Sequence, residues 1–309
     1  MSNSTKPAIC IFTYKNRYST LLNYTNKLID EFPVFIVFSK DDPKLSEYDE
    51  YVFDERIVKL YVDAPTLGVK KQFAFDYLYD HGYEYVMFCD DDLEDFGMEI
   101  NESTKRTTSD SYRKVKIPLE TLFDRMYEAA LKYNSVLTST TQMFLLGFAT
   151  RPGSVFINNK INFGQLVLYN IKRIKEKNIV FDTRPQVHDD IDFGMEILRA
   201  GLTSVTINDI CFVVKSASQK RENSTMINDE NLDRMRINLY LKYRDGLTLR
   251  VTKKGELALR SKLENYWNTY EIPIIDDPYH NELVRLCKEY DIEGLKQHIL
   301  SKKIKKKKS

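Results

Sequence analysis

The sequence predicts an α/β fold with a mainly parallel sheet, flanking helices and a C-terminal helical extension. Over about the first ninety residues, short apolar runs and helical segments follow one another as strand, helix, strand, strand, helix, strand. The apolar run Tyr85–Cys89 then stops abruptly at Asp90, Asp91 and Asp92. Such a run is typical of a strand that is buried on both faces and ends at the surface.

The elements of this first part can be placed in order. Each predicted strand is a short apolar run, and each predicted helix repeats its apolar residues every three or four positions. Gly82 lies at the expected C-terminal cap of the second helix. The strands are predicted at Ala8–Thr13, Val34–Phe38 and Ile57–Val62, and the helices at Tyr18–Glu31 and Val69–Asp80.

The remaining elements are less regular. Residues 93–116 are polar and charge-mixed, which predicts a long surface loop. Thr203–Lys215 predicts a strand, a turn at Asn208-Asp209 and a second strand. Helices are expected at 118–133, 187–202 and 232–244, and sheet segments within 135–148, 151–161 and 163–169. We expect a catalytic domain at 1–225, a helical extension at 226–300 and a lysine-rich tail at 301–309.

Composition narrows the class of protein. The formal net charge of +1 over 309 residues gives no global attraction to nucleic acid or membranes, so any basic function must be local. Four widely spaced cysteines lack metal or redox spacing, and neither a signal region nor a membrane-spanning run is present. We therefore expect a soluble cytoplasmic protein. The absence of Gly-x-Gly-x-x-Gly and Walker sequences argues against a dinucleotide or P-loop site.

Ligands of parallel α/β sheets bind beyond the carboxyl ends of the strands. That rule predicts one rim formed by 13–17, 39–41, 66–71 and 90–92. Alternate residues of an extended chain point the same way, so Asp90 and Asp92 can converge on one ion while Asp91 faces elsewhere. Carboxylate oxygens suit Mg²⁺ or Mn²⁺. The alternative is a solvated acidic loop.

A second acidic stretch opens the predicted helix at 187–202. Asp189 and Asp190 lie in its first turn, and Asp192 follows. The helix dipole stabilises acids at this position by about 0.3–1 kcal/mol each, which explains them without catalysis. A carboxylate aimed at the rim is the catalytic alternative. The residue types leave both interpretations open.

Four segments together resemble the GT-A class of nucleotide-sugar glycosyltransferases, whose sheet is Rossmann-like. They cover roughly residues 6–216 and come in that class's order. The segments are Ile9-Cys-Ile-Phe-Thr-Tyr-Lys-Asn-Arg17, Gly68-Val-Lys-Lys-Gln72, Phe88-Cys-Asp-Asp-Asp92 and Asp189-Asp-Ile-Asp-Phe193. The third is similar to the Asp-x-Asp metal motif, and the fourth to the Glu-Asp-x-Asp segment of inverting members, with Asp189 where Glu is usual.

The resemblance implies a metal-dependent, inverting hexosyl- or pentosyltransferase that uses a UDP-sugar and Mn²⁺ or Mg²⁺ held by Asp90 and Asp92. Asp190 aligns with the base, and Asp189 or Asp192 would shape the site or hold the acceptor. Relatives often supply a further metal ligand after the last strand, which is missing here; either the two aspartates suffice or His188 contributes. The implied nucleotide-sugar contacts are Thr13, Tyr14, Asn16, Arg17, Ser39, Lys70, Lys71, Asp90 and Asp91.

Within this class the chain looks most like the TET-associated DNA glycosyltransferases of phages, which implies hydroxymethylated pyrimidine, such as hydroxymethylcytosine, in DNA as the acceptor. If the chain is phage-encoded, the implied location is the host cytoplasm. The lysine-rich tail from Lys302 is a candidate for phosphate contacts, although such tails also serve solubility. Further candidate contacts to DNA are Lys105, Arg106, Tyr112, Arg113 and Lys114.

Two alternatives stay open. One is a glycosyltransferase that acts on a polysaccharide or a protein. The other belongs to a different class, a nucleotide-sugar-binding or DNA-binding protein without turnover. The acidic segments favour an enzyme over the latter.

Overall fold

The computed structural model describes residues 7–14, 28–50, 53–91, 93–101, 112–142, 155–157, 165–184, 189–214, 229–261 and 278–308. The chain divides into two compact units, and the main division falls between Lys220 and Arg221. The first unit holds a large sheet with helices, and the second holds three helices and a hairpin.

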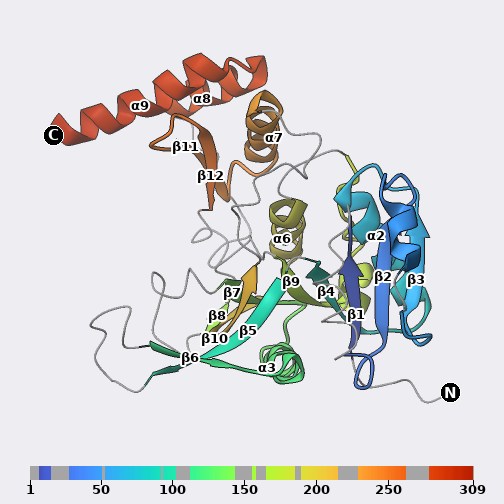
Figure 1. The fold of residues 1–309 in the computed structure, drawn as a ribbon. Helices are drawn as coiled ribbons and strands as arrows, with labels where there is room; N and C mark the ends of the chain where they lie inside the picture. The colour runs from blue at the N-terminus through green and yellow to red at the C-terminus, as the bar shows by residue number, and fades with distance from the viewer. Residues whose placement is uncertain are drawn as a thin grey trace. The chain divides into compact units, whose positions relative to one another are not determined.

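The sheet of the first unit has the strand order β3-β2-β1-β4-β9-β7-β10-β5-β6, with β8 also paired to β10 (Figure 1). Within the described residues, seven strands run in one direction, and only β5, β8 and β9 run against them. The strands are β1 (Ala8–Phe12), β2 (Val34–Ser39), β3 (Val58–Val62), β4 (Tyr85–Asp90), β5 (Leu93–Asn101), β6 (Tyr112–Lys116), β7 (Leu137–Gln142), β8 (Val155–Ile157), β9 (Leu166–Asn170) and β10 (Ser204–Val214).

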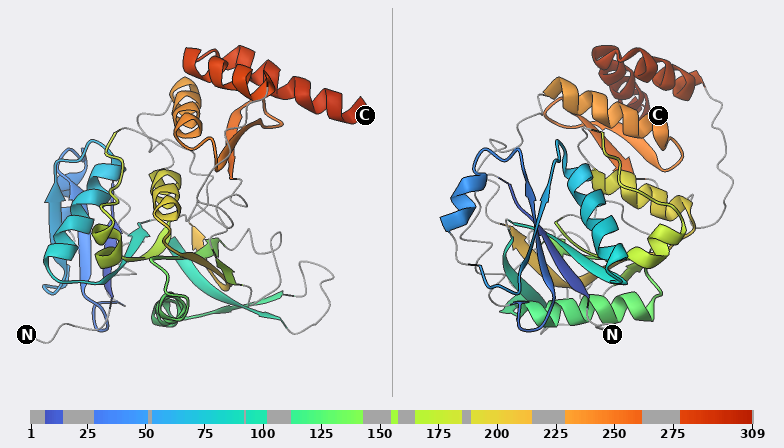
Figure 2. Two further views of the ribbon diagram at one scale, coloured as in Figure 1. Left: turned by 180° about the vertical axis from the view of Figure 1, so that it is seen from behind. Right: turned by 90° about the vertical axis from the view of Figure 1, so that its right-hand side faces the viewer.

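Helices cover both faces of this sheet, as Figures 1 and 2 show. Side chains alternate along β1: Ile9 and Ile11 pack with α3 (Leu119–Lys132) on one face, whereas Ala8, Cys10 and Phe12 pack with α2 (Leu67–Asp80), α5 (Ile171–Glu176) and α6 (Asp189–Arg199) on the other. The unit also has the short 3-10 helix η1 (Leu45–Glu50). This three-layer arrangement confirms the predicted α/β fold.

An aromatic cluster forms the core beneath α2 and α6. Phe75 of α2 is fully buried and contacts the rings of Phe88, Tyr169, Phe181 and Phe193 edge-on. The rings of Phe181 and Phe193 stack with their centroids 3.7 Å apart. Each such pair contributes about 0.5–1.5 kcal/mol beyond the burial of its area. The cluster therefore fixes both helices against one face of the sheet.

The prediction of a loop over residues 93–116 was wrong. Strands β5 and β6 form an antiparallel pair in which Gly97 lies opposite Lys116 and Asn101 opposite Tyr112, and residues 102–111 lie outside the described part. Leu93 and Phe96 are buried in the core that contains α3. β5 carries acids between its apolar residues, so the average polarity of this segment is high. The strand pattern was therefore not recognised in the sequence.

The predicted turn at Asn208-Asp209 was also wrong, because β10 continues through it. The pairing of β10 with β7 shifts register between Ile207 and Cys211, so the intervening residues form a bulge. The Thr140 hydroxyl donates to the Ile210 carbonyl across this bulge. Turn-forming residues inside a strand often mark a bulge of this kind.

The second unit consists of α7 (Asp229–Lys242), the hairpin of β11 (Leu247–Val251) and β12 (Leu257–Ser261), α8 (Pro278–Glu289) and α9 (Ile292–Lys308). Its core joins residues of all five elements, including Tyr240, Leu249 and Leu295. The extension is thus helical with an added hairpin, which the sequence did not predict. The backbone of the lysine-rich tail continues α9 as far as Lys308.

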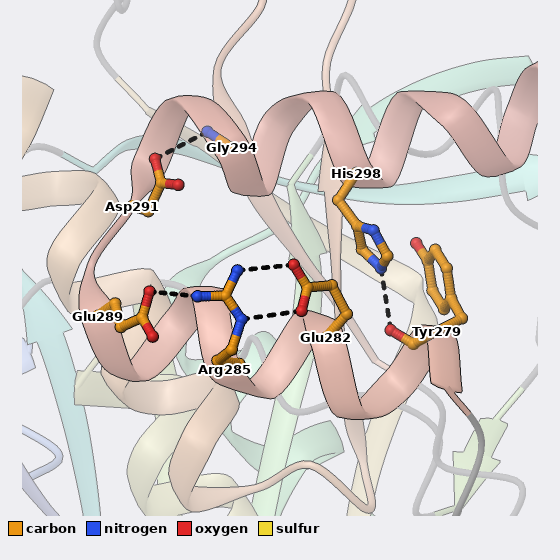
Figure 3. Close-up of polar contacts among 7 residues, drawn as sticks. All are labelled: Tyr279, Glu282, Arg285, Glu289, Asp291, Gly294 and His298. Atoms are coloured by element: carbon orange, nitrogen blue, oxygen red, sulfur yellow. Dashed lines mark hydrogen bonds and ion pairs between the residues drawn. The ribbon is translucent and has the colours of Figure 1, made fainter.

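Polar contacts hold the first part of α9 against its neighbours in the second unit (Figure 3). Asp291 accepts a hydrogen bond from the Gly294 amide at 2.9 Å and so caps the first turn of α9. The His298 ring donates to the Tyr279 carbonyl at 2.9 Å, and Lys296 pairs with Asp233 of α7 at 3.4 Å. These contacts and buried Ile299 hold the first part of α9 in the unit.

All four cysteines are free and buried. Burial raises the pKa of the Cys287 thiol to about 12 and that of Cys89 well above its ordinary value, so neither forms a reactive thiolate near neutral pH. None of the described helices is both long and apolar enough to cross a membrane.

Candidate active site

The carboxyl ends of β1, β2 and β4 meet at one edge of the sheet, because these strands are parallel neighbours. Phe12 pairs with Val37 on one side and with Asp90 on the other, so the three strands end almost level. Thr13 follows β1 and Ser39 ends β2. We call this edge, together with the first turns of α2 and α6, the rim.

Asp91 connects the ends of β4 and β1. Its side chain is buried and accepts hydrogen bonds from the Thr13 hydroxyl at 2.8 Å and the Tyr14 amide at 3.3 Å. Thr13 also contacts the Tyr48 hydroxyl at 2.9 Å. Asp90, in contrast, is half-buried. The two neighbouring aspartates therefore have different environments, and Asp91 supports the backbone of the rim.

Ser39 carries a buried hydroxyl without a hydrogen-bond partner among the described residues. Its carbonyl accepts from the Asp42 amide at 3.2 Å, which turns the chain directly after β2. An unsatisfied buried hydroxyl costs about 1–3 kcal/mol. A polar ligand that bonded to Ser39 would remove that cost.

Lys70 extends from α2 to the end of β1. Its ammonium donates to the Thr13 carbonyl at 3.0 Å and lies 5.0 Å from the centre of the Tyr14 ring. Burial lowers the pKa of Lys70 to about 8, although the carboxylates of Asp42, Asp91 and Asp41 counteract this effect. The side chain therefore changes charge slightly above neutral pH.

Lys71 joins α2 to α6. Its ammonium donates to the Asp189 carboxylate at 2.5 Å, and the side chains are 11% and 14% exposed. Burial alone would lower the pKa of Lys71, but Asp189, Tyr169 and Asp90 outweigh burial and leave that pKa above its ordinary value. Lys71 is therefore a permanent positive charge within the acidic rim.

Tyr169 of β9 lies opposite Val86 of β4 and is buried, and it was not among the site residues predicted from the sequence. Burial raises the pKa of its phenol, Lys71 lowers it, and Asp189, Asp190 and Asp90 raise it further. Charges from β4, α2 and α6 thus act on one buried phenol. No sequence signal separates Tyr169 from the apolar residues Leu166–Leu168 before it.

The start of α2 is held by the segment that precedes α6. Thr66 caps α2 by accepting from the Val69 amide at 3.2 Å, and its hydroxyl donates to the Thr183 carbonyl at 3.1 Å. A Cβ atom on Gly68 would lie 2.1 Å from the Asp182 carbonyl oxygen. Gly68 is therefore required by close packing of two backbones, which places Lys70 and Lys71 at the rim.

The first turn of α6 carries the second acidic cluster. Asp189 and Asp190 are half-buried, whereas Asp192 is 2% exposed. The apolar residues Ile191, Met195 and Leu198 are buried and anchor the helix. Their anchoring fixes the acidic turn at the rim, where Lys71 meets Asp189.

Comparison with known proteins identifies the family. The family model described as TET-Associated Glycosyltransferase matches residues 9–223, more than half of the chain. The chain belongs to the TET-associated glycosyltransferases. No curated protein matches it in sequence.

Solved structures identify the fold of this TET-associated glycosyltransferase. It is similar to S. aureus TarS 1–349 in complex with UDP-GlcNAc, with 11% identity, a TM-score of 0.55, and coverage of 97% of this chain and 92% of that one. The complex of the same protein with UDP gives 12% identity, a TM-score of 0.52, and coverage of 97% and 91%. The fold is GT-A, as the resemblance implied, and the protein is a glycosyltransferase.

Several residues proposed for this glycosyltransferase from sequence lie outside the described part. They are Asn16, Arg17, Asp92, Lys105, Arg106 and His188. The backbone of Tyr112–Lys114 belongs to β6 and pairs with 99–101, at the opposite end of β5 from Leu93. At about 3.4 Å a residue, Arg113 lies some 20 Å along the sheet from the rim. We therefore leave Tyr112–Lys114 out of the site.

Part of the predicted metal site lies among the described residues. Asp90 at the end of β4 offers oxygen ligands, which Mg²⁺ and Mn²⁺ prefer. Among the described residues no group of three or more His, Cys, Asp or Glu is placed to hold a metal, and Asp92 is not among those residues.

Proposed function

We propose that this TET-associated glycosyltransferase moves a sugar from a UDP-sugar to the hydroxyl of hydroxymethylcytosine in DNA, with inversion at the sugar. The observation that carries the proposal is the meeting of the ends of β1, β2 and β4 with the Lys71–Asp189 ion pair at the carboxyl end of the sheet. Parallel α/β sheets bind their ligands there. An acidic rim with embedded lysines suits an anionic donor that binds with a cation.

The donor would bind along the ends of β1 and β2. Thr13, Tyr14, Ser39 and Lys70 surround this part of the rim, and the buried Ser39 hydroxyl is open to a ligand's hydrogen bond. The likeness to TarS, which was crystallised with UDP-GlcNAc and with UDP, supports a uridine diphosphate donor. We expect Lys70 to contact the diphosphate.

Asp90 and Asp92 would hold Mn²⁺ or Mg²⁺. When bound, such an ion neutralises the charge that develops on a departing diphosphate. Asp91 would act differently from its neighbours, because its carboxylate already bonds to Thr13 and Tyr14 and so keeps the ends of β4 and β1 together.

Asp190 would be the general base. It would accept the proton of the acceptor hydroxyl while the acceptor oxygen bonds to the anomeric carbon and the bond from that carbon to the diphosphate breaks. Asp189 is the weaker candidate, because its carboxylate is engaged by Lys71 at 2.5 Å. A single displacement of this kind inverts the configuration.

The proposal of a DNA acceptor rests on the family's name and on the positive charge of residues 302–308. The family's name, TET-associated glycosyltransferase, together with the resemblance to phage DNA glycosyltransferases, supports a hydroxymethyl group in DNA as acceptor. Residues 302–308 contain six lysines and no acid, which suits the phosphate backbone of DNA. A DNA acceptor would place the reaction in the cytoplasm, that of the host if the chain is phage-encoded.

Release of UDP tests this function. The purified protein with Mn²⁺ and a UDP-sugar is expected to release UDP faster when hydroxymethylcytosine duplex DNA is added, and mass spectrometry should find the sugar on that base. The same duplex with unmodified cytosine is the control. Stimulation by an oligosaccharide or a peptide in place of DNA would reject the DNA acceptor.

The lysines at the end of α9 are expected to strengthen DNA binding. Replacing Lys302, Lys303 and Lys305–Lys308 by Gln keeps the length of the chain but removes six charges. Each phosphate contact contributes about 0.9 to the slope of log affinity against log salt, so the slope should become flatter by up to about 5 and binding at low salt should weaken at least tenfold. Fluorescence anisotropy between about 50 and 200 mM salt measures the affinity and its salt dependence. Over that range the affinity of the wild type is expected to fall roughly a thousandfold if all six lysines contact phosphates.

The exposed pair Lys253 and Lys254 in the β11–β12 turn gives a control for the loss of lysine charge elsewhere in the same unit. Replacing that pair by Gln should change the slope much less. If the α9 variant bound DNA as the wild type does, the tail would serve solubility instead.

Lys70 is expected to make donor binding depend on pH. With a pKa of about 8 it is mostly protonated at pH 7, and an anion beside it would raise that pKa. UDP affinity should therefore fall as pH rises through 8, by about tenfold for one charge-assisted hydrogen bond. Calorimetry with UDP measures this dependence. Lys70→Arg, which stays protonated, should flatten it, and an equally steep fall in that variant would exclude Lys70 as the cause.

A further inference from the structure

Lys71 is a buried lysine whose positive charge is balanced by a carboxylate of the protein itself. Its ammonium donates to Asp189 at 2.5 Å and lies 6.0 Å from the centre of the Phe181 ring. The two partners are 118 residues apart in the sequence. The ion pair is therefore a tertiary contact between the first turns of α2 and α6.

The α2 side of this contact is rigid. Gly68 packs against the Asp182 carbonyl, and the Gln72 side chain accepts from the Phe181 amide at 2.8 Å. Gln72 in turn donates to Asp76 at 2.8 Å, and Asp76 pairs with Lys175 of α5 at 2.5 Å. Lys71 thus projects from a turn whose neighbours on both sides are fixed to other elements.

On its other side, the ion pair belongs to α6, the helix that holds the proposed general base. Asp189 is the first residue of α6, and Asp190 follows it directly. The two residues share one turn of the helix, and Asp189 is bonded to Lys71. A displacement of Asp189 would therefore move Asp190 as well.

The sequence offered another role for Lys71, a direct contact with the diphosphate of the donor. That role needs an ammonium whose charge is not already balanced by a direct carboxylate partner. Lys71 donates to the Asp189 carboxylate at 2.5 Å, which balances its charge. Both lysines are buried, but among the described residues the hydrogen bond of the Lys70 ammonium goes to the neutral Thr13 carbonyl at 3.0 Å, so Lys70 is better suited to the diphosphate.

We propose that Lys71 is a positioning residue: through its ion pair with Asp189 it holds the start of α6 so that Asp190 faces the acceptor hydroxyl near Asp90. This inference rests on the proposed function and assigns Lys71 a part in it that does not involve contact with the donor. It predicts that loss of the pair slows the chemical step and leaves donor binding almost unchanged.

Steady-state kinetics of four variants test the inference. Lys71→Met and Asp189→Asn should each lower kcat at least thirtyfold while the KM for the UDP-sugar and the Kd for UDP stay within about threefold, in line with the loss expected when a catalytic group is misplaced. The double variant should be no slower than the worse single one, because both remove the same contact. Lys71→Arg should recover most of kcat.

A diphosphate contact gives the opposite pattern. In that case Lys71→Met would weaken UDP binding at least tenfold with little effect on uridine, whereas Asp189→Asn would not. That pattern, or a wild-type kcat in Lys71→Met, would overturn the inference. Thermal unfolding identifies any variant that fails to fold, and Lys71→Arg with Asp189→Glu then supplies the comparison.

Hydrogen exchange gives a readout that does not need activity. Amides at the start of α6 should exchange faster in Lys71→Met than in the wild type, while those of α3 on the other face of the sheet keep their rates. Equal rates in α6 would overturn the inference. Failure of the proposed function is separate, since it would show as a wild-type protein that transfers no sugar to hydroxymethylcytosine DNA.

Discussion

Asp190→Asn is expected to lower the turnover of the glycosyltransferase by about 10²–10⁴-fold, the range over which a general base contributes. The amide cannot accept the proton of the acceptor hydroxyl, whereas its size and its place in the first turn of α6 are unchanged. Metal-dependent binding of UDP should stay at the wild-type level. Single-turnover transfer to hydroxymethylcytosine DNA and calorimetry with UDP measure the two effects.

Glu196 of the same helix offers a matched control. It is half-buried and lies almost two turns beyond Asp190. Glu196→Gln removes one carboxylate from α6 without touching the acidic turn, and its turnover should remain close to that of the wild type. A variant Asp190→Asn that kept wild-type turnover would transfer the role of base to another group.

Asp90→Asn is expected to remove the effect of Mn²⁺ on UDP binding and to lower turnover by about 10³-fold, since a Lewis-acid ion supplies several kcal/mol. The carboxylate at the end of β4 is the described part of the proposed metal site. UDP titrations with Mn²⁺ and with a chelator should give nearly the same affinity in the variant and different affinities in the wild type.

Glu84 precedes the amino end of the same strand, where its carboxylate accepts from Asn170 at 3.2 Å. Glu84→Gln therefore controls for loss of an acid beside the same strand but at its other end, and its response to Mn²⁺ should match the wild type. If Asp90→Asn still bound UDP in a metal-dependent way, the metal would have to be held elsewhere.

Strands β1 and β2 could be predicted because they are buried on both faces. Ala8–Phe12 and Val34–Ser39 are almost wholly apolar, and no other local structure suits so short a run between turn residues. Strand β5 escaped prediction because it lies next to an acidic motif and carries acids itself. The bulge in β10 was taken for a turn, since Asn and Asp favour both.

The sequence predicted which segments form the rim, but it did not predict which side chains of those segments contact one another. The parallel-sheet rule brings Thr13, Ser39 and Asp90 together from their positions after strands. Nothing in local sequence shows that Lys71 pairs with Asp189, or that the charges of this pair act on the pKa of Tyr169 in an antiparallel strand. Such contacts depend on how α2 and α6 pack, which the spacing of residues along the chain does not encode.

The position of β6 has a consequence for experiments on charge. Within the described residues β6 is the last strand of the sheet, and its sequence Tyr-Arg-Lys-Val-Lys is strongly basic. Basic residues on an edge strand oppose intermolecular sheet extension. Neutralising Arg113 and Lys114 would therefore promote self-association, and a resulting change in DNA binding would reflect aggregation as much as lost contacts.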